Sequence, residues 1–319
     1  MDRAQNDFQH GLDKGLDLHE FWIPGTDCDL GYRNIRDLDN DTCTEIRRLL
    51  EVYWDQCKDF MDEKFREEFA RQPDARFWEI YLCRRLLNAG HPLVKRKERP
   101  AKGPDFFIDD GDRRVWIEAV TFGHGHVENP DRVPEMEFRS VEDDGPLVAQ
   151  PVPVNEVELR ISSVFDKKSN KFKEYAINGL VGINDVNLIA INPGKVSMHA
   201  GYEGRGSPMC VLYPLGDQYV TFFKDTDKTA SGYHLRTEIK KALGREVPIG
   251  VFADEQHNYV SAVIWSKTTL GNFFYDHNDL TLYPNTTPDH PLPAGWLDWA
   301  HEWEARVVSE DSCELKRIV

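Results

Sequence analysis

The sequence predicts an α/β protein in which a mixed central sheet is flanked by helices, with a helical N-terminal region and an α+β C-terminal extension. Three observations support this class. Apolar residues recur every three or four positions in residues 41–71, which predicts an amphipathic helix. Two apolar runs, 106–108 and 115–117, flank an Asp-Asp-Gly-Asp turn and predict a β-hairpin. Residues 186–192 are almost continuously apolar, as in a strand that is buried on both faces.

The composition is that of an ordinary globular protein. The chain has 319 residues, of which 40% are hydrophobic, and such a chain can build a normal core. We expect a cytoplasmic protein without a membrane segment, because no apolar run approaches about eighteen residues and the N-terminus lacks the pattern of a secretory signal. The six cysteines are widely scattered, which predicts neither a disulfide framework nor a structural zinc site.

The formal net charge is −16. This charge weakens the case for a partner that is DNA or RNA, since such binding normally relies on Lys and Arg to neutralise phosphates. Basic residues are nevertheless dense at 95–99 and at 167–173. The acidic excess elsewhere would limit non-specific binding to nucleic acid or favour a basic protein partner.

The N-terminal half divides at prolines and glycines. Residues 1–40 show no sustained period and predict an irregular arm, and 41–71 predict one long helix or a kinked pair. Pro73 ends this region and opens a second helix at 75–88. Residues 91–97 predict a short extended segment that pairs with the hairpin. The expected domains are an N-terminal arm and helical region, a core, and a C-terminal extension, at residues 1–72, 73–200 and 201–319.

Two carboxylates mark the open end of the hairpin. A turn near Gly111 places Asp105 roughly opposite Glu118. Two carboxylates held together repel each other and lose hydration, which costs free energy unless a cation neutralises them. Mg²⁺ is typically held by one or two carboxylates together with water and substrate phosphate. The hairpin therefore predicts a site for a hard divalent cation, and ordinary hairpin ends in an unrelated α/β protein are the alternative.

At these residues the chain resembles the PD-(D/E)xK nuclease superfamily, which has the restriction-endonuclease-like fold. Pro104-Asp105 matches the PD element, and Glu118-Ala119-Val120 lies where the (D/E)xK element is expected, thirteen positions after Asp105. The resemblance implies that Asp105, Glu118 and the Ala119 carbonyl bind Mg²⁺ or Mn²⁺. It also implies hydrolysis of phosphodiester bonds in DNA or RNA, and a homodimer is compatible with the habits of the family.

The chain departs from the family motif at its last position. The family lysine, which is taken to orient or activate the attacking water, is Val120 here. Some members supply this lysine from another element, so Lys168 and Lys171 on the predicted helix 156–178 are candidates, with a basic solvated helix face as the alternative. Because of Val120, a catalytically inactive module that binds nucleic acid or a protein partner is the second hypothesis for the function.

Two further features follow from the resemblance. Glu79 matches a glutamate that the family tends to carry on a helix before the hairpin, although a solvated helix glutamate explains it equally well. Lys171 to Tyr175 loosely matches a Gln-x-x-x-Tyr element of the exonuclease-like branch, with lysine in place of glutamine.

Asn155 is expected to cap the helix 156–178. This helix would cross over to the strand 186–192 in a βαβ unit.

The remaining segments are less distinctive. The segment 121–153 predicts a long loop, and its His124, His126 and Glu128 suggest a transition-metal site or, with more weight, a solvated or substrate-contacting loop. In the last third we expect additions to the same sheet, namely strands at 210–213, 218–223, 249–252 and 260–265 and a helix at 234–243. Trp299 and Trp303 suggest a short amphipathic helix that packs on the body, with a base-stacking platform as the alternative.

Overall fold

The chain forms two compact units, which are described separately. The computed structural model describes residues 20–25, 27–136, 150–224, 226, 228–253, 255–274, 279–297, 300–309 and 312–317, and at 304–309 and 312–315 only the backbone. Unit 1 is drawn from Met1–Ala101 and Thr269–Asp276, and unit 2 from Lys102–Thr268 and His277–Val319. The predicted second helix thus belongs to unit 1, and the hairpin belongs to unit 2.

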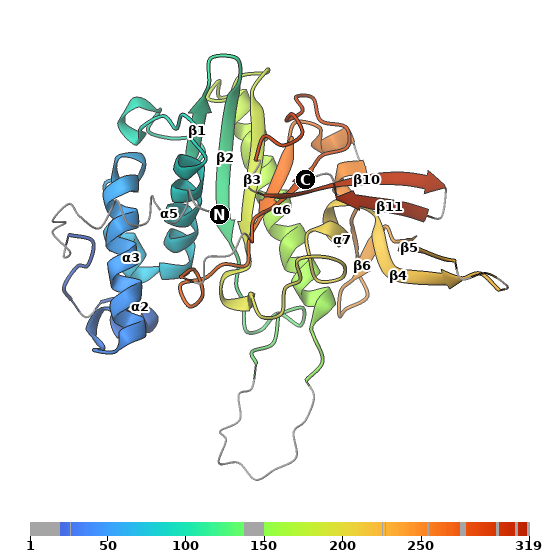
Figure 1. Ribbon diagram of the computed structural model, residues 1–319, viewed down its shortest axis with the longest axis horizontal. Helices are drawn as coiled ribbons and strands as arrows, with labels where there is room; N and C mark the ends of the chain where they lie inside the picture. The colour runs from blue at the N-terminus through green and yellow to red at the C-terminus, as the bar shows by residue number, and fades with distance from the viewer. Residues whose placement is uncertain are drawn as a thin grey trace, which may run out of the picture. The chain divides into compact units, whose positions relative to one another are not determined.

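Unit 1 is helical, as the periodicity predicts. Its helices are α2 (Leu30–Asp37), α3 (Asp41–Cys57), η1 (Lys58–Phe60), α4 (Phe65–Arg71) and α5 (Pro73–Asn88) (Figure 1). The predicted helix 41–71 is therefore interrupted between residues 58 and 64. Asn40 caps α3 by accepting a hydrogen bond from the Cys43 N–H. Pro73 occupies the first turn of α5, where its missing N–H costs nothing.

Two predictions for unit 1 are wrong. Within the predicted irregular arm, residues 30–37 form α2, because Asp29 caps the helix through the Gly31 N–H; residues 1–19 lie outside the described residues. The segment 91–97 is not a strand of the sheet, and Arg96–Glu98 form the 3-10 turn η2. The Arg96 side chain donates to the carbonyls of Pro100 and Ala101 at 2.9 and 2.7 Å, which curls the chain.

Unit 2 contains a nine-stranded mixed sheet in the order β1-β2-β3-β8-β9-β10-β11-β5-β4 (Figure 1). The predicted hairpin is β1 (Phe106–Asp109) and β2 (Arg114–Thr121), paired antiparallel. The central strand β3 (Val186–Asn192) is parallel to both β2 and β8 (Ala262–Trp265). All seven residues of β3 are buried, so the prediction of a strand covered on both faces is confirmed.

Helix α6 (Val154–Ile177) connects β2 to the parallel strand β3, which confirms the predicted βαβ unit. Its apolar stripe, which includes Val157, Ile161, Phe165 and Phe172, belongs to the core cluster that also contains Trp116 of β2. The helix begins two residues earlier than predicted, after Pro153. Asn155 is therefore inside the helix and is not its cap, and its side-chain oxygen accepts from Arg205 at 2.7 Å.

The same sheet extends further, as expected, through β9 (Thr281–Pro284), β10 (His301–Ser309), β11 (Ser312–Arg317), β5 (Thr229–Leu235) and β4 (Leu215–Phe222), while residues 238–248 contribute a separate two-stranded sheet. The predicted strands at 218–223 and 260–265 correspond to β4 and β8. The loop prediction for 121–153 holds for residues 122–136, which contain no helix or strand, while 137–149 lie outside the described part of the chain.

Several predictions for this region are wrong. Residues 209–212 form the helical turn α7 (Met209–Leu212), in which the Leu212 N–H donates to the Pro208 carbonyl. The expected helix 234–243 is instead the end of β5 followed by β6 (Glu238–Lys240), which pairs with β7 (Glu246–Pro248) across a turn where Gly244 has a φ of 82°. The expected strand 249–252 overlaps the 3-10 turn η4 (Val251–Ala253).

The predicted helix around Trp299 and Trp303 is also not observed at Trp303. Trp303 lies in β10 and packs against the core cluster, so the expected helix is wrong and packing on the body is confirmed. Trp299 lies outside the described residues. Among the helices of the described segments, none combines the length and apolar character needed to cross a membrane.

Candidate functional site: a carboxylate pair and two lysines

The hairpin register places Asp105 against Glu118. Phe106 pairs with Ile117, so the preceding residue Asp105 lies across from Glu118 at the open end of the hairpin, as predicted from the turn. Asp105 comes before β1 begins, and its Oδ2 accepts a hydrogen bond from the Ala119 N–H at 2.7 Å. This contact fixes one carboxylate beside the end of β1, while Glu118 is buried on β2.

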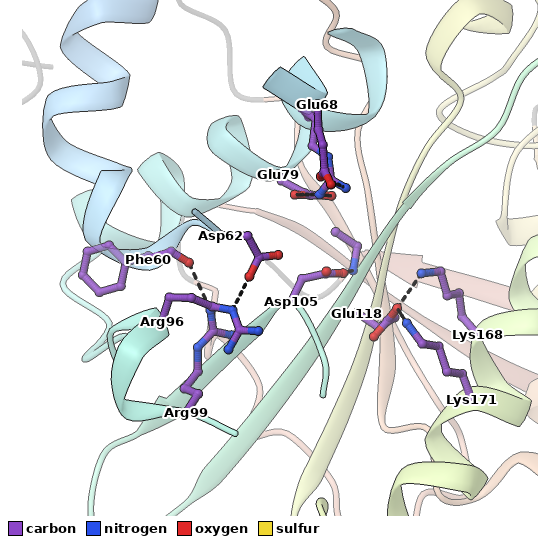
Figure 2. Close-up of polar contacts among 12 residues, drawn as sticks. Phe60, Asp62, Glu68, Glu79, Arg96, Arg99, Asp105, Glu118, Lys168 and Lys171 are labelled. Atoms are coloured by element: carbon purple, nitrogen blue, oxygen red, sulfur yellow. Dashed lines mark hydrogen bonds and ion pairs between the residues drawn. The ribbon is translucent and has the colours of Figure 1, made fainter. Parts of the chain in front are cut away.

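Helix α6 brings two ammonium groups to Glu118 (Figure 2). The Nζ atoms of Lys168 and Lys171 each lie 2.5 Å from Oε1 of Glu118. The Tyr175 hydroxyl donates to Oε2 of the same carboxylate at 3.1 Å. Positions three and seven residues after Lys168 fall on the same face of a helix, and this face of α6 meets β2. The prediction that these lysines reach the hairpin is confirmed.

Burial and neighbouring charges shift the pKa values of three groups in the cluster. Burial and the negative charge of Glu118 raise the pKa of Asp105 from 3.8 to about 6, although the two lysines and the Ala119 N–H act in the opposite direction. Burial alone would lower the pKa of Lys171, but the charge and hydrogen bond of Glu118 hold it above its ordinary value. Burial also raises the pKa of Tyr175 to about 12. Lys171 therefore remains charged near neutral pH, and Asp105 takes up a proton at a higher pH than an ordinary aspartate does.

The residues present fit a hard divalent cation. Asp105 and Glu118 supply two carboxylates, and the N–H and C=O of one strand residue point to the same side. The carbonyl of Ala119 is thus directed to the side from which its N–H contacts Asp105. The pKa of Asp105 is raised first by burial and then by the charge of Glu118, and a bound cation would favour the ionised form that both effects disfavour. Among the residues that the structure describes, no group of three or more His, Cys, Asp or Glu gathers in a way that could hold a metal, and Mg²⁺ commonly uses fewer carboxylates with water.

Glu79 lies in unit 1, on α5. Both of its carboxylate oxygens accept from the Arg76 guanidinium, at 2.8 and 2.6 Å, and Arg76 also pairs with Glu68 at 2.5 Å (Figure 2). These contacts explain the conformation of Glu79 within its own unit. A role for Glu79 beside Asp105 and Glu118 stays a prediction.

One histidine of the loop after β2, His124, makes a structural contact. The His124 Nδ1 lies 2.9 Å from the Val133 carbonyl, and the Val133 N–H bonds to the His124 carbonyl at 2.9 Å. His126 and Glu128 are exposed. Among the described residues, no group of three or more His, Cys, Asp or Glu side chains is arranged to hold a metal, so nothing here supports the transition-metal alternative.

Tyr175 is the contact of Glu118 that the sequence reasoning did not include among the site residues. The signal was available, because Tyr175 lies four positions after Lys171 and thus on the same helix face. Its hydroxyl donates to Oε2 of Glu118, the carboxylate oxygen that neither lysine contacts. The Lys171 ammonium lies 5.3 Å from the centre of the Tyr175 ring.

No family model, curated protein or solved structure matches this chain. The resemblance to the PD-(D/E)xK superfamily accordingly stays a hypothesis that depends on the residues of the chain itself.

Proposed function

We propose that this protein is a divalent-metal-dependent phosphodiesterase that hydrolyses DNA or RNA, with a PD-(D/E)xK-like site whose lysines come from α6. The observation that carries the proposal is the convergence of Lys168 and Lys171 on Glu118, next to Asp105. A carboxylate pair can hold a divalent cation, and an adjacent ammonium group can stabilise the charge that develops on a phosphate, so the set suits metal-dependent phosphodiester hydrolysis. It also answers the objection that Val120 raises, because a lysine reaches the carboxylates from another element.

The side chains have distinct roles in this proposal. Asp105, Glu118 and the Ala119 carbonyl would hold Mg²⁺ or Mn²⁺, which when bound would lower the pKa of a water and polarise the phosphate. The Lys171 side chain is 41% exposed and Lys168 only 14%. Lys171 would therefore contact the phosphate and stabilise charge that develops in the transition state, and Lys168 would position Glu118.

The alternative is a catalytically inactive module that binds nucleic acid or a protein partner. One observation favours it: both oxygens of Glu118 already have hydrogen-bond donors, two ammonium groups on Oε1 and a phenol on Oε2. A carboxylate that is satisfied in this way gains less from a metal than a bare one would. The two functions differ in whether any strand is cut.

The test is a cleavage assay on end-labelled single-stranded DNA, duplex DNA and RNA with Mg²⁺, Mn²⁺ or a chelator. We expect metal-dependent cleavage that Asp105→Ala and Glu118→Ala each abolish. Lys171→Met should reduce the rate by at least about a hundredfold, which is the usual cost of removing one group that stabilises the transition state.

Asp112→Asn is the matched control, because Asp112 is an exposed residue of the same hairpin at its turn end. Circular dichroism of each variant separates lost activity from lost folding. Cleavage that persists in both folded carboxylate variants would refute the site. Retained binding of nucleic acid with no cleavage by the wild type would favour the inactive module.

A further inference from the structure

Strand β4 offers an unusual open edge. It is the last strand of the nine-stranded sheet, and among the described residues it pairs only with β5. Figure 1 shows the β4–β5 hairpin projecting from the body of unit 2. Val220, Phe222 and Phe223 are 53%, 78% and 50% exposed. A long edge strand with exposed apolar residues is a template for pairing with another strand.

The hydrogen-bond pattern identifies which backbone groups face the open edge. The Phe223 N–H donates to the Lys228 carbonyl at 3.2 Å, and Phe222 pairs with Thr229 as the next step of the ladder. Hydrogen-bonded and non-hydrogen-bonded pairs alternate along an antiparallel ladder. The odd-numbered residues of β4 therefore bond to β5, and the N–H and C=O groups of Gln218, Val220 and Phe222 point to the open edge.

We propose that two copies of this chain form a two-fold symmetric dimer by antiparallel pairing of their β4 strands. In such a ladder, residues that oppose each other must both point to the partner or both point away, so only registers that pair even with even and odd with odd positions are allowed. Three such registers lie near the middle of the exposed segment, and they centre on Val220, Thr221 or Phe222.

The side chains select the register that centres on Thr221. Val220 then opposes Phe222 of the second copy, Tyr219 opposes Phe223 of the second copy, and Thr221 opposes itself. These are the aromatic, aromatic with β-branched and Thr–Thr pairs that stabilise antiparallel sheets. Each exposed apolar residue of the strand gains an apolar neighbour, and Lys224 at the end of the ladder opposes Gln218.

The two neighbouring registers lack this match. Centring on Val220 sets Phe222 against Gln218 and Phe223 against the charged Asp217. Centring on Phe222 pairs Phe222 with itself and Thr221 with Phe223, which are favourable pairs, but it sets the apolar Val220 against the charged Lys224. Of the three registers, the one centred on Thr221 alone pairs Tyr219, Val220, Phe222 and Phe223 each with an apolar or aromatic partner. This self-complementarity favours a second copy over an unrelated strand as the occupant. This inference does not depend on the proposed phosphodiesterase activity.

Cysteine cross-linking tests the register directly. Thr221 forms a non-hydrogen-bonded pair with its own copy, where Cα atoms lie about 4.5 Å apart, within the range of about 4.4–6.8 Å for a disulfide. Val220 is displaced from its own copy by a diagonal of about 7–8 Å. Thr221→Cys should cross-link efficiently under diamide, which accepts the two electrons and two protons released, and Val220→Cys should not. Wild type under diamide controls for the native cysteines, and efficient cross-linking of Val220→Cys with none of Thr221→Cys would overturn the register.

Analytical ultracentrifugation over a wide concentration range tests the dimer itself. The paired surface is small, so we expect a concentration-dependent equilibrium in the wild type. Phe222→Lys should shift it to the monomer, because it places two charges in the ladder. Leu243→Lys, which alters a side chain that is 86% exposed in the β6–β7 turn, should leave it unchanged. A wild type that stays monomeric throughout, or a dimer that Phe222→Lys does not weaken, would overturn the proposal.

Discussion

The Nζ atom of Lys171 lies 2.5 Å from Oε1 of Glu118, although the two residues are 53 positions apart. The contact joins the helix of the βαβ unit to the strand that precedes it. It depends on the register of β1 against β2, which sets where Glu118 stands, and on the helical spacing that places Lys168 and Tyr175 on the same face. The cluster is therefore both a structural tie between α6 and the sheet and the centre of the proposed active site.

Removing Glu118 should destabilise the protein more than removing either lysine. Glu118→Gln leaves two ammonium groups facing a neutral side chain, and breaking a buried ion pair in this way costs on the order of 3 kcal/mol. Lys168→Met should cost about 1–2 kcal/mol, and Lys171→Met less, because its side chain is 41% exposed and its charge is screened. Urea unfolding at neutral pH measures all three.

Glu174→Gln is the control for this series, because Glu174 is an exposed residue of the same helix and should change stability little. A double-mutant cycle of Glu118→Gln with Lys168→Met should show a coupling of about 1 kcal/mol or more. Additive effects would contradict the contact.

The raised pKa of Asp105 predicts how stability depends on pH in the absence of metal. Because the native carboxyl binds its proton more tightly than the unfolded one, the cost of charging it is absent below about pH 4 and complete above about pH 6. Asp105→Asn keeps an oxygen acceptor for the Ala119 N–H and avoids the charge. This variant should therefore gain stability relative to wild type as pH rises through this window, by on the order of 2 kcal/mol.

Unfolding curves of wild type and Asp105→Asn at several pH values in a chelator provide the measurement. Asp112→Asn, on the same hairpin, controls for general effects of removing one acidic charge. A difference between Asp105→Asn and wild type that stays constant with pH would show that burial and Glu118 do not perturb Asp105.

Metal affinity should rise with pH, whereas the contribution of Asp105 to the stability of the metal-free protein should fall. A cation binds the deprotonated carboxylate, so Mn²⁺ affinity should rise as pH increases through about 6 and should be lost in Asp105→Ala. Isothermal titration of Mn²⁺ at several pH values measures it, with a short single-stranded DNA present so that phosphate oxygens can complete the coordination. Equal binding by wild type and Asp105→Ala would contradict a cation at the hairpin.

The core of the fold could be predicted because its signals are local. The turn around Gly111 and the alternation on both sides of it determine the pairing of Asp105 with Glu118, and the helical spacing of Lys168 and Lys171 determines their common face. The buried strand β3 follows from an unbroken apolar run. In each case a short segment contains its own evidence, and the tertiary structure does not override it.

The errors arise where a short pattern suits two structures. The run 210–213 is apolar throughout, and periodicity cannot distinguish a buried strand from a helical turn over four residues. The spacing of Trp299 and Trp303 matches a helix, yet Trp303 lies in β10, since long-range pairing determines a strand. Gly244, with a φ of 82°, suits the end of the predicted helix 234–243 as well as the turn of the β6–β7 hairpin that the chain forms instead.

Tyr175 should contribute to stability through a single hydrogen bond. Its hydroxyl is buried against Oε2 of Glu118 at 3.1 Å, and hydrogen bonds to charged groups contribute about 1.5–3 kcal/mol. Tyr175→Phe keeps the ring and its contact with the Lys171 ammonium and removes only the hydroxyl. We expect a loss near the lower end of that range in urea unfolding. A stability equal to that of wild type would show that water replaces the phenol.

Besides Glu118 on β2, unit 2 has a second buried carboxylate, Glu158 on α6. Removing its charge should destabilise the fold about as much as removing that of Glu118, but should not affect catalysis. Glu158 is fully buried, and Oε1 accepts from Arg205 at 2.8 Å and from the Gly206 N–H at 2.9 Å, while Oε2 lies 2.5 Å from Arg236. Glu158→Gln would leave two guanidinium groups without a counter-charge, at a cost of about 3–5 kcal/mol. Glu174→Gln, at an exposed position of the same helix, is the control and should change little.

The two carboxylates of α6 and β2 can then be distinguished by their effects. Glu158→Gln should lower the urea midpoint as Glu118→Gln does, and should also release the glycine-rich segment 201–207, which hydrogen exchange would detect as faster exchange of the Gly206 amide. At a temperature where the variant stays folded, cleavage and Mn²⁺ affinity should match the wild type, because Glu158 contacts none of Asp105, Glu118 or the two lysines. Loss of Mn²⁺ binding in folded Glu158→Gln would place the cation elsewhere than at the hairpin.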